Sequence, residues 1–246
     1  MQAAALVLIA QQDSLTRALD VVANNVANAS TTGFKREELQ FETFVSRPAA
    51  NEKIDFAVER GTLRDTAAGP LLTTGNPFDV AIQGAGYFPI QTREGTRYTR
   101  GGAFQLNGAG ELITAGGDKV LGEGDQPITL PSDAEDVQIS GDGVIAAKSG
   151  GGTTMTQVGK LKLVKFANEQ ALQSVGSGFY TSSQPPEADT ESRLVQGTVE
   201  QSNVRSVSEI THMIEIMRAY QMSVHLLDLD NQRRTNAIDK LARTSA

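Results

Sequence analysis

Histidine and carboxylate side chains are the groups in this sequence that could bind a metal or transfer a proton. The only histidines, His212 and His225, lie thirteen residues apart, whereas two zinc ligands on one helical face follow an i, i+4 spacing. Several carboxylates in the middle of the chain fall at expected turns, where Asp is favoured because it bonds to the backbone: Asp118, Asp125, Asp133, Glu135, Asp136 and Asp142. No two of them stand out as the catalytic pair of a glycosidase. We therefore predict no catalytic residue, no metal site and no cofactor.

The glycine clusters do not fit a nucleotide-binding loop. Gly84-Ala85-Gly86 lacks a third glycine and precedes a strand-like run, where a dinucleotide-binding loop would precede a helix. Gly122-Glu123-Gly124 carries an acidic residue that would repel phosphate. These glycines are predicted to form turns.

The composition argues against a nucleic-acid partner and against disulfides. The net charge is −7 and there is no cysteine, whereas phosphate binding needs clustered Lys and Arg. Lys35-Arg36 and Arg233-Arg234 are isolated basic pairs and are predicted to be solvated. An apolar run at residues 3–10 lacks a preceding basic residue and a cleavage site, and no run approaches the ~18 residues of a membrane span. We expect no direct membrane insertion, and either a cytoplasmic protein or export without cleavage.

A long amphipathic helix is predicted at each end of the chain. In residues 1–33, apolar positions step by fours and threes in a coiled-coil pattern, with Gly33 ending the helix and Thr32 and Phe34 beside it at the start of a connector. Residues 201–246 repeat the pattern without Pro or Gly, and the expected helix at 204–242 would be about 57 Å long. The predicted seam residues are Leu8, Leu15, Leu19, Val22, Val26, Val207, Ile210, Ile214, Met217 and Val224.

The middle of the chain has the rhythm of hairpins. Short strand-like runs are separated by glycine turns, and the strands are expected at 79–83, 87–92, 96–100, 103–106, 111–114, 137–140, 144–147 and 161–166. The predicted fold class is α+β. Two terminal helices pair as a coiled coil (1–33 and 201–246), with a connector of loose strands (34–75) and a central Gly-rich all-β domain (76–200).

One helix pair hides only part of each apolar stripe, so neighbouring copies are expected to cover the rest. Head-to-tail contacts of this kind do not close and would build a filament. Asn25 and Asn28 flank the N-terminal seam. Because Asn is a poor residue for a helix interior, they are either solvated or bonded to neighbouring helices in a way that fixes register; their spacing leaves both interpretations open.

Three separated motifs resemble one known family. Residues 24–36 (NNVANASTTGFKR) resemble the N-terminal signature of the flagellar rod, hook and hook-associated axial proteins, and residues 74–84 (TGNPFDVAIQG) resemble the rod and hook type of β domain. Asn203, Arg218 and Tyr220 match the C-terminal signature, and the resemblance adds them to the expected assembly interface. Residues 122–124, 127–131, 141–143 and 158–165 resemble the F-type proximal rod subunit, and the distal G type remains the alternative.

The resemblance implies a structural subunit of the flagellar basal-body rod that spans the periplasm and transmits torque. It implies export by the flagellar type III apparatus, and contact with other copies of the chain and with the B, C and G types of rod protein. Two other classes, a secreted peptidoglycan-acting enzyme and a self-contained coiled-coil adhesin, would instead require a catalytic cleft or a small closed oligomer.

Overall fold

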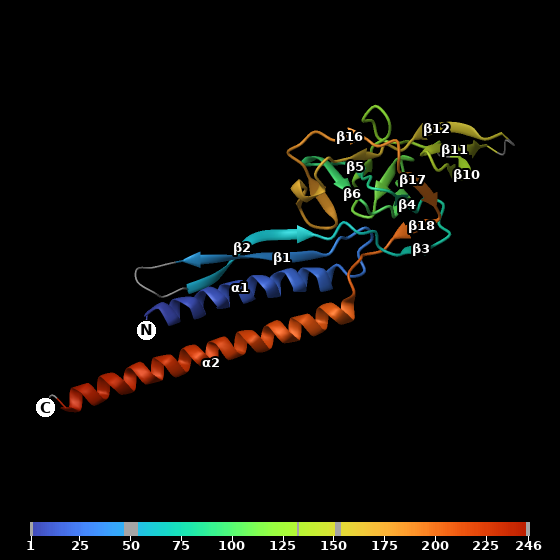
Figure 1. Cartoon of the computed structure of the whole chain (residues 1–246). Coiled ribbons are helices and arrows are strands. Elements are labelled where there is room, and N and C mark those ends of the chain that lie inside the picture. The colour runs from blue at the N-terminus through green and yellow to red at the C-terminus, as the bar shows by residue number, and fades with distance from the viewer. Residues whose placement is uncertain (1, 47–53, 132, 151–153, 245–246) are drawn as a thin grey trace. The chain divides into compact units, whose positions relative to one another are not determined.

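The computed structural model describes all residues except 1, 47–53, 132, 151–153 and 245–246. The chain divides into two compact units. The helical unit comprises Met1–Ala27, Glu37–Asp65 and Arg205–Ala246, and the β unit comprises Asn28–Arg36 and Thr66–Val204. A helix at each terminus and a β-rich middle confirm the α+β class (Figure 1).

The helical unit is built on two antiparallel helices, α1 (Gln2–Ala27) and α2 (Ser206–Thr244). Near one end of the pair, the Ser223 hydroxyl donates to the Leu8 carbonyl oxygen at 3.5 Å. Near the other end, the Asn25 amide donates to the Glu209 carboxylate at 3.2 Å. Because α2 has 39 residues and α1 has 26, the C-terminal turns of α2 extend past the start of α1 (Figure 1). Within the described residues, neither helix is long and apolar enough to cross a membrane.

A long β-hairpin completes the helical unit. Strands β1 (Glu37–Ser46) and β2 (Ile54–Arg64) pair antiparallel, with a shift in register between Gln40 and Phe41. The hairpin lies along α1 on the side away from α2 (Figure 1). The segment predicted as a loose connector, 34–75, thus contains one regular hairpin and the short strand β3 (Leu71–Thr73).

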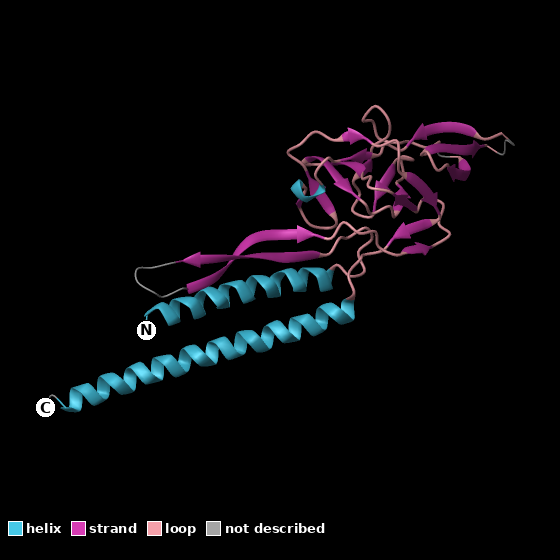
Figure 2. Cartoon of the chain, viewed as in Figure 1, coloured by secondary structure: helices cyan, strands magenta, loops and turns pink. Residues whose placement is uncertain are grey.

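The β unit consists of short strands with one turn of 3₁₀ helix at Glu169–Ala171 (Figure 2). Its largest sheet has seven strands in the order β14-β15-β6-β5-β9-β8-β7, beside a three-stranded sheet β10-β11-β12 and the pairs β13-β16, β17-β4 and β18-β3. The bounds are β4 (Val80–Gln83), β5 (Phe88–Thr92), β6 (Gly95–Thr99), β7 (Phe104–Leu106), β8 (Leu112–Thr114), β9 (Lys119–Val120), β10 (Ala134–Ile139), β11 (Val144–Ser149), β12 (Thr156–Lys160), β13 (Val164–Lys165), β14 (Gln173–Ser174), β15 (Phe179–Thr181), β16 (Glu187–Ala188), β17 (Arg193–Gln196) and β18 (Thr198–Glu200).

The predicted strands between 79 and 114 correspond to β4 through β8 within one or two residues at each end. The largest difference is at 161–166, where only Val164–Lys165 is a strand and β12 lies just before it. The sheets enclose an apolar core that includes Val80, Phe88 and Ile90, each of which is fully buried. A second cluster packs Tyr87 against Phe166 and Tyr180 in edge-on contacts, with ring centroids 5.8 and 6.0 Å apart.

Candidate functional site

The helix pair buries a face of α2 that steps by sevens. Glu209, Ile216 and Ser223 are 2%, 7% and 2% exposed, and Met213, Tyr220 and Leu227, on the same side, are half-buried. We call these six residues the packed face. Along the helix, the packed face steps alternately by four and three residues, which is the spacing of a coiled-coil seam.

The stripe predicted from sequence lies on a different side of α2. Val207, Ile210, Ile214 and Met217 are 81%, 47%, 45% and 45% exposed, and we call these four residues the exposed stripe. At about 100° per residue, the exposed stripe is centred roughly a third of a turn from the packed face. The sequence analysis missed the packed face because Glu209 and Ser223 interrupt its apolar pattern.

The predicted residues of α1 are covered by the chain itself. Val22 is buried, and Leu8, Leu15, Leu19 and Val26 are half-buried. Asn28 lies beyond the end of α1, in a turn where its side chain accepts a hydrogen bond from the Thr31 hydroxyl at 3.2 Å. The exposed predicted residues therefore all lie on α2, where Arg218 is exposed and Val224 is half-buried.

Asn25 joins the three elements of the helical unit. Its side chain is 0% exposed, accepts from the Glu37 N–H at 2.9 Å and donates to the Glu37 carbonyl oxygen at 2.8 Å. The same amide nitrogen donates to Glu209 of α2. Asn25 thus bonds the start of β1 and the first turn of α2 within its own chain.

Replacing Asn25 by Ala should destabilise the helical unit by about 3 kcal/mol, because the half-buried Glu37 peptide and the buried Glu209 carboxylate would each lose a partner. Urea unfolding followed by far-UV circular dichroism measures the change. The exposed amide Gln11 on α1 supplies the control, and Gln11→Ala should shift the transition by less than ~0.5 kcal/mol. An equal effect of both substitutions would contradict this role of Asn25.

A buried ionic cluster lies in the β unit and joins Lys35, Arg100 and Glu200. Glu200 accepts from Lys35 at 2.6 Å and from the Arg100 Nε at 2.9 Å, and also from the Gly69 N–H at 3.0 Å. Lys35, Arg100 and Glu200 are 1%, 3% and 1% exposed. The prediction that Lys35 is solvated is therefore wrong; Glu200, which the sequence analysis did not single out, buries it.

Each charge in this cluster has further partners. Lys35 donates to the Ala67 carbonyl oxygen at 2.8 Å, and Arg100 donates to the Gly86 carbonyl oxygen at 2.9 Å. Burial, followed by the neighbouring Arg100 charge, lowers the pKa of Lys35. Burial opposes ionisation of Glu200, but Arg100 and Lys35 outweigh it and hold its pKa below the usual value. The cluster is an ion triad whose members also bond to the backbone of Ala67, Gly69 and Gly86.

The predicted residues Thr32, Gly33 and Phe34 directly precede Lys35 of this cluster. α1 ends at Ala27, six residues before Gly33. Gly33 has φ +70° and donates its N–H to the Glu200 carbonyl oxygen at 2.8 Å, while Thr32 is half-buried and Phe34 is buried. Asn203 binds the same region, accepting from the Arg36 N–H at 2.7 Å and donating to Ala67 at 3.1 Å.

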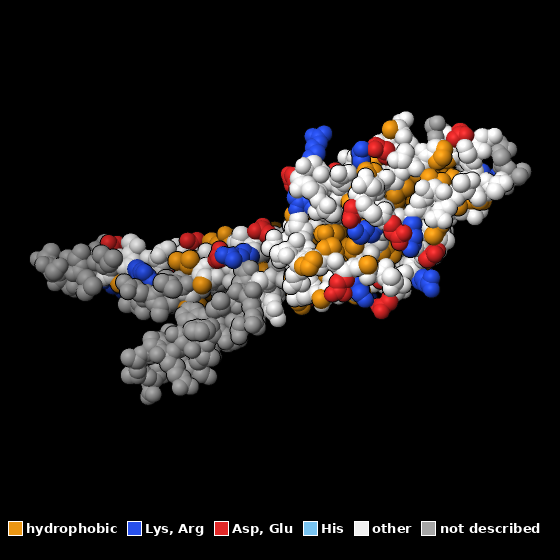
Figure 3. Space-filling view, turned by 90° about the horizontal axis from the view of Figure 1, so that it is seen from above, with side chains coloured by type: hydrophobic (Ala, Val, Ile, Leu, Met, Phe, Trp, Pro, Cys, Tyr) orange, Lys and Arg blue, Asp and Glu red, His pale blue; other side chains and the backbone are white. Residues whose placement is uncertain are grey.

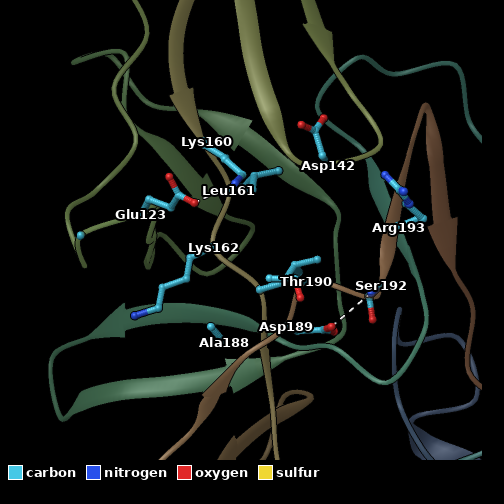
Figure 4. Close-up of a pocket in the computed structure, with 12 residues that line it drawn as sticks. Glu123, Asp142, Lys160, Leu161, Lys162, Ala188, Asp189, Thr190, Ser192 and Arg193 are labelled. Carbon is cyan, nitrogen blue, oxygen red and sulfur yellow. Dashed lines mark hydrogen bonds and ion pairs between the residues drawn. The ribbon is translucent and has the colours of Figure 1, made fainter.

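A small cavity of about 220 Å³ opens on the β unit beside Asp142, Lys160 and Asp189 (Figure 4). Lys160 is paired with Glu123 at 2.7 Å. Asp189 accepts from the Ser192 N–H at 3.1 Å. Hydrogen bonding from Ser140 lowers the pKa of Asp142, whereas a general acid needs a raised pKa. The hydrogen bond to Asp142 therefore does not favour a general-acid role for this residue.

The surface of the β unit has no large region of one charge on the face shown in Figure 3, where acidic and basic side chains alternate. Within the described part of the chain, no group of three or more His, Asp or Glu residues could hold a metal ion. The features that stand out are therefore a buried junction in each unit and an exposed apolar helix face.

Models of three protein families match three successive segments of the chain. Residues 8–35 match "Flagella basal body rod protein", residues 81–147 match "Flagellar hook protein FlgE/F/G D1 domain", and residues 195–239 match "Flagellar basal body rod FlgEFG protein C-terminal". These segments contain most of α1, strands of the β-unit core and most of α2.

Relatives match along the whole chain. The flagellar basal-body rod protein FlgF of Caulobacter vibrioides is 35% identical over 241 residues, which cover 96% of each chain. FlgF of Mesorhizobium japonicum is 34% identical over 248 residues and 100% of each chain. FlgG of Agrobacterium fabrum is 35% identical over 230 residues, covering 83% of this chain and 86% of that protein. The chain therefore belongs to the flagellar basal-body rod proteins of the FlgF and FlgG type, which are structural proteins of the basal body that spans the periplasm and not enzymes.

Proposed function

We propose that this chain is a proximal (F-type) rod subunit that assembles helically through its terminal helices and transmits torque. The observation that carries the proposal is the exposed stripe, Val207, Ile210, Ile214 and Met217, on a helix whose packed face is already covered by α1. A helix that is apolar on more than one side is normally surrounded by protein. Neighbouring subunits would supply that protein.

The pairing of α1 with α2 as a coiled coil is part of the proposal. The packed face steps by sevens, which supports it. In this arrangement α1 covers one side of α2, and neighbours cover the exposed stripe together with Arg218 and Val224. Ordering of the helices would be completed on incorporation, as in coupled folding and binding.

The proposed partners are other copies of this chain and rod proteins of the B, C and G types, with delivery by the flagellar type III export apparatus. Neither nucleic acid nor direct membrane insertion has a role. The distal G type is the second candidate, because relatives named FlgG match the chain at up to 35% identity. A longer alignment with FlgF relatives, covering up to 100% of both chains, favours the F type.

Replacing Ile214 by Asp should abolish rod assembly and leave the fold intact. Ile214 is 45% exposed, so the charge costs little in the isolated chain but would be buried without a partner in the assembled rod. We expect unchanged circular dichroism, non-motile cells and basal bodies that lack a complete rod.

His212, two residues away and exposed on another side of α2, provides the matched control. His212→Asp should leave the cells motile. Motile cells carrying Ile214→Asp, with complete rods in isolated basal bodies, would refute assembly through the exposed stripe.

A further inference from the structure

α2 has a second exposed apolar face, which neither α1 nor the exposed stripe accounts for. Met222, Leu226 and Leu229 are 67%, 46% and 40% exposed. At about 100° per residue, these side chains lie roughly a third of a turn from the packed face, in the other direction around the helix from the exposed stripe. We call this the second face.

Opposite charges stand at the two ends of the second face. Glu215 precedes the apolar residues and Arg233 follows them, and both are exposed. They are 18 residues apart, which is about five full turns, so both side chains point to the same side as Met222 and Leu226.

The pattern is self-complementary under a two-fold axis at the level of Val224. Met222 and Leu226 lie two residues before and two residues after Val224. Glu215 and Arg233 lie nine residues before and nine residues after it. We propose that the second face pairs antiparallel with the second face of another copy of this chain, forming a closed dimer of unassembled subunits. Met222 then packs on the partner copy's Leu226, and Glu215 pairs with its Arg233, twice by symmetry.

Charge selects this arrangement over parallel ones. A parallel pair in register would place Glu215 beside Glu215 and Arg233 beside Arg233, which repel. A parallel pair staggered by 18 residues would join Arg233 to Glu215, but it would set Leu226 opposite Ser208 and so lose the apolar contact. Of these three arrangements, only the antiparallel one satisfies the charges and the apolar side chains together.

The dimer has a consequence that rests on the proposed function. In a head-to-tail helical assembly all copies point the same way, so two antiparallel α2 helices have no place in it. The dimer is therefore a state of the unassembled chain: pairing orders this part of α2 and covers Met222 and Leu226, and the pair separates when a subunit is incorporated.

Charge exchange in the full-length chain tests the pairing. Glu215→Arg and Arg233→Glu should each weaken the dimer about tenfold in sedimentation equilibrium, because each variant turns two attractions into two repulsions. The double exchange, Glu215→Arg with Arg233→Glu, should restore the dissociation constant to within about threefold. Asp228→Arg, an exposed charge on another side of α2, is the control and should leave the constant within about threefold of the original.

Cross-linking tests the register. The chain has no cysteine, so mixed Met222→Cys and Leu226→Cys chains should oxidise with each other in preference to themselves, because a disulfide needs the two Cα atoms within about 7 Å. A chain that stays monomeric to its solubility limit, or single charge variants that dimerise normally, or a double exchange that fails to restore pairing, would overturn the inference. None of these results touches the proposed function, which the effect of Ile214→Asp on rods decides separately.

Discussion

Replacing Glu200 by Gln should destabilise the β unit by about 3–5 kcal/mol. The substitution keeps the shape of the side chain but removes the negative charge between Lys35 and Arg100, which are 1% and 3% exposed. Breaking a buried ion pair by removing one partner leaves an uncompensated buried charge. Here two cations would remain together in the interior.

Urea unfolding followed by tyrosine fluorescence measures this loss. Three of the four tyrosines, Tyr87, Tyr98 and Tyr180, lie in the β unit, so the signal reports mainly on that unit. The surface pair of half-buried Lys165 and exposed Glu191, 3.4 Å apart, is the control, and Glu191→Gln should change stability by less than ~1 kcal/mol. Comparable losses for the two variants would show that the triad contributes no more than a surface pair.

Lowering the pH should reduce the difference in the free energy of unfolding between the Glu200→Gln variant and the original chain. Arg100 and Lys35 hold the pKa of Glu200 below its usual value against the effect of burial. Its contribution is therefore complete above the unfolded-state pKa, about 4.3, and is lost as the pH falls through the lower folded-state pKa. Urea unfolding at pH 7 and near pH 3 should show that the stabilities of the two chains converge at the lower pH. A stability difference that does not depend on pH would contradict this account.

The terminal helices could be predicted from the sequence because their signal is local and periodic. The apolar spacing and the absence of Pro and Gly after Gly197 specify a long C-terminal helix, and α2 spans Ser206–Thr244. The spacing also selected the residues of the exposed stripe, but it predicted them as the seam of the helix pair, and they are exposed in this structure. It could not show which side of α2 meets α1, because Glu209 and Ser223 occupy that side and are satisfied by Asn25 and by the Leu8 backbone.

The two buried junctions depend on residues far apart in the chain. Lys35 and Arg36 form a basic pair that suggests a solvated surface, and only Glu200, 165 residues away, makes the burial of Lys35 possible. Asn25 is similar, since its partner Glu209 is 184 residues away. A single sequence carries the residue types of such junctions but no signal for their pairing. The resemblance in residues 24–36 marked the segment without revealing these bonds.

Replacing Gly33 by Ala should destabilise the β unit by about 3 kcal/mol or more. Gly33 has φ +70°, a left-handed conformation that costs an L-residue roughly 1–2 kcal/mol. A Cβ atom there would also lie 2.4 Å from the Arg100 carbonyl carbon and from the Gly101 nitrogen. The backbone atoms at Arg100 cannot rotate away as a flexible side chain would, so the segment must shift.

Gly75 separates these two effects. It has φ +74°, and a Cβ added to it would meet no atom within 4 Å, so Gly75→Ala should cost only the conformational strain, roughly 1–2 kcal/mol. The same urea unfolding measures both variants. The additional loss of stability in Gly33→Ala, compared with Gly75→Ala, reports the close approach of residue 33 to the Arg100 backbone. Because that shift would also disturb the bond from Arg100 to Glu200, Gly33→Ala and Glu200→Gln should together cost less than the sum of their separate effects. Additive losses, or equal losses for the two glycine variants, would mean that the loop after α1 is not held against the buried triad.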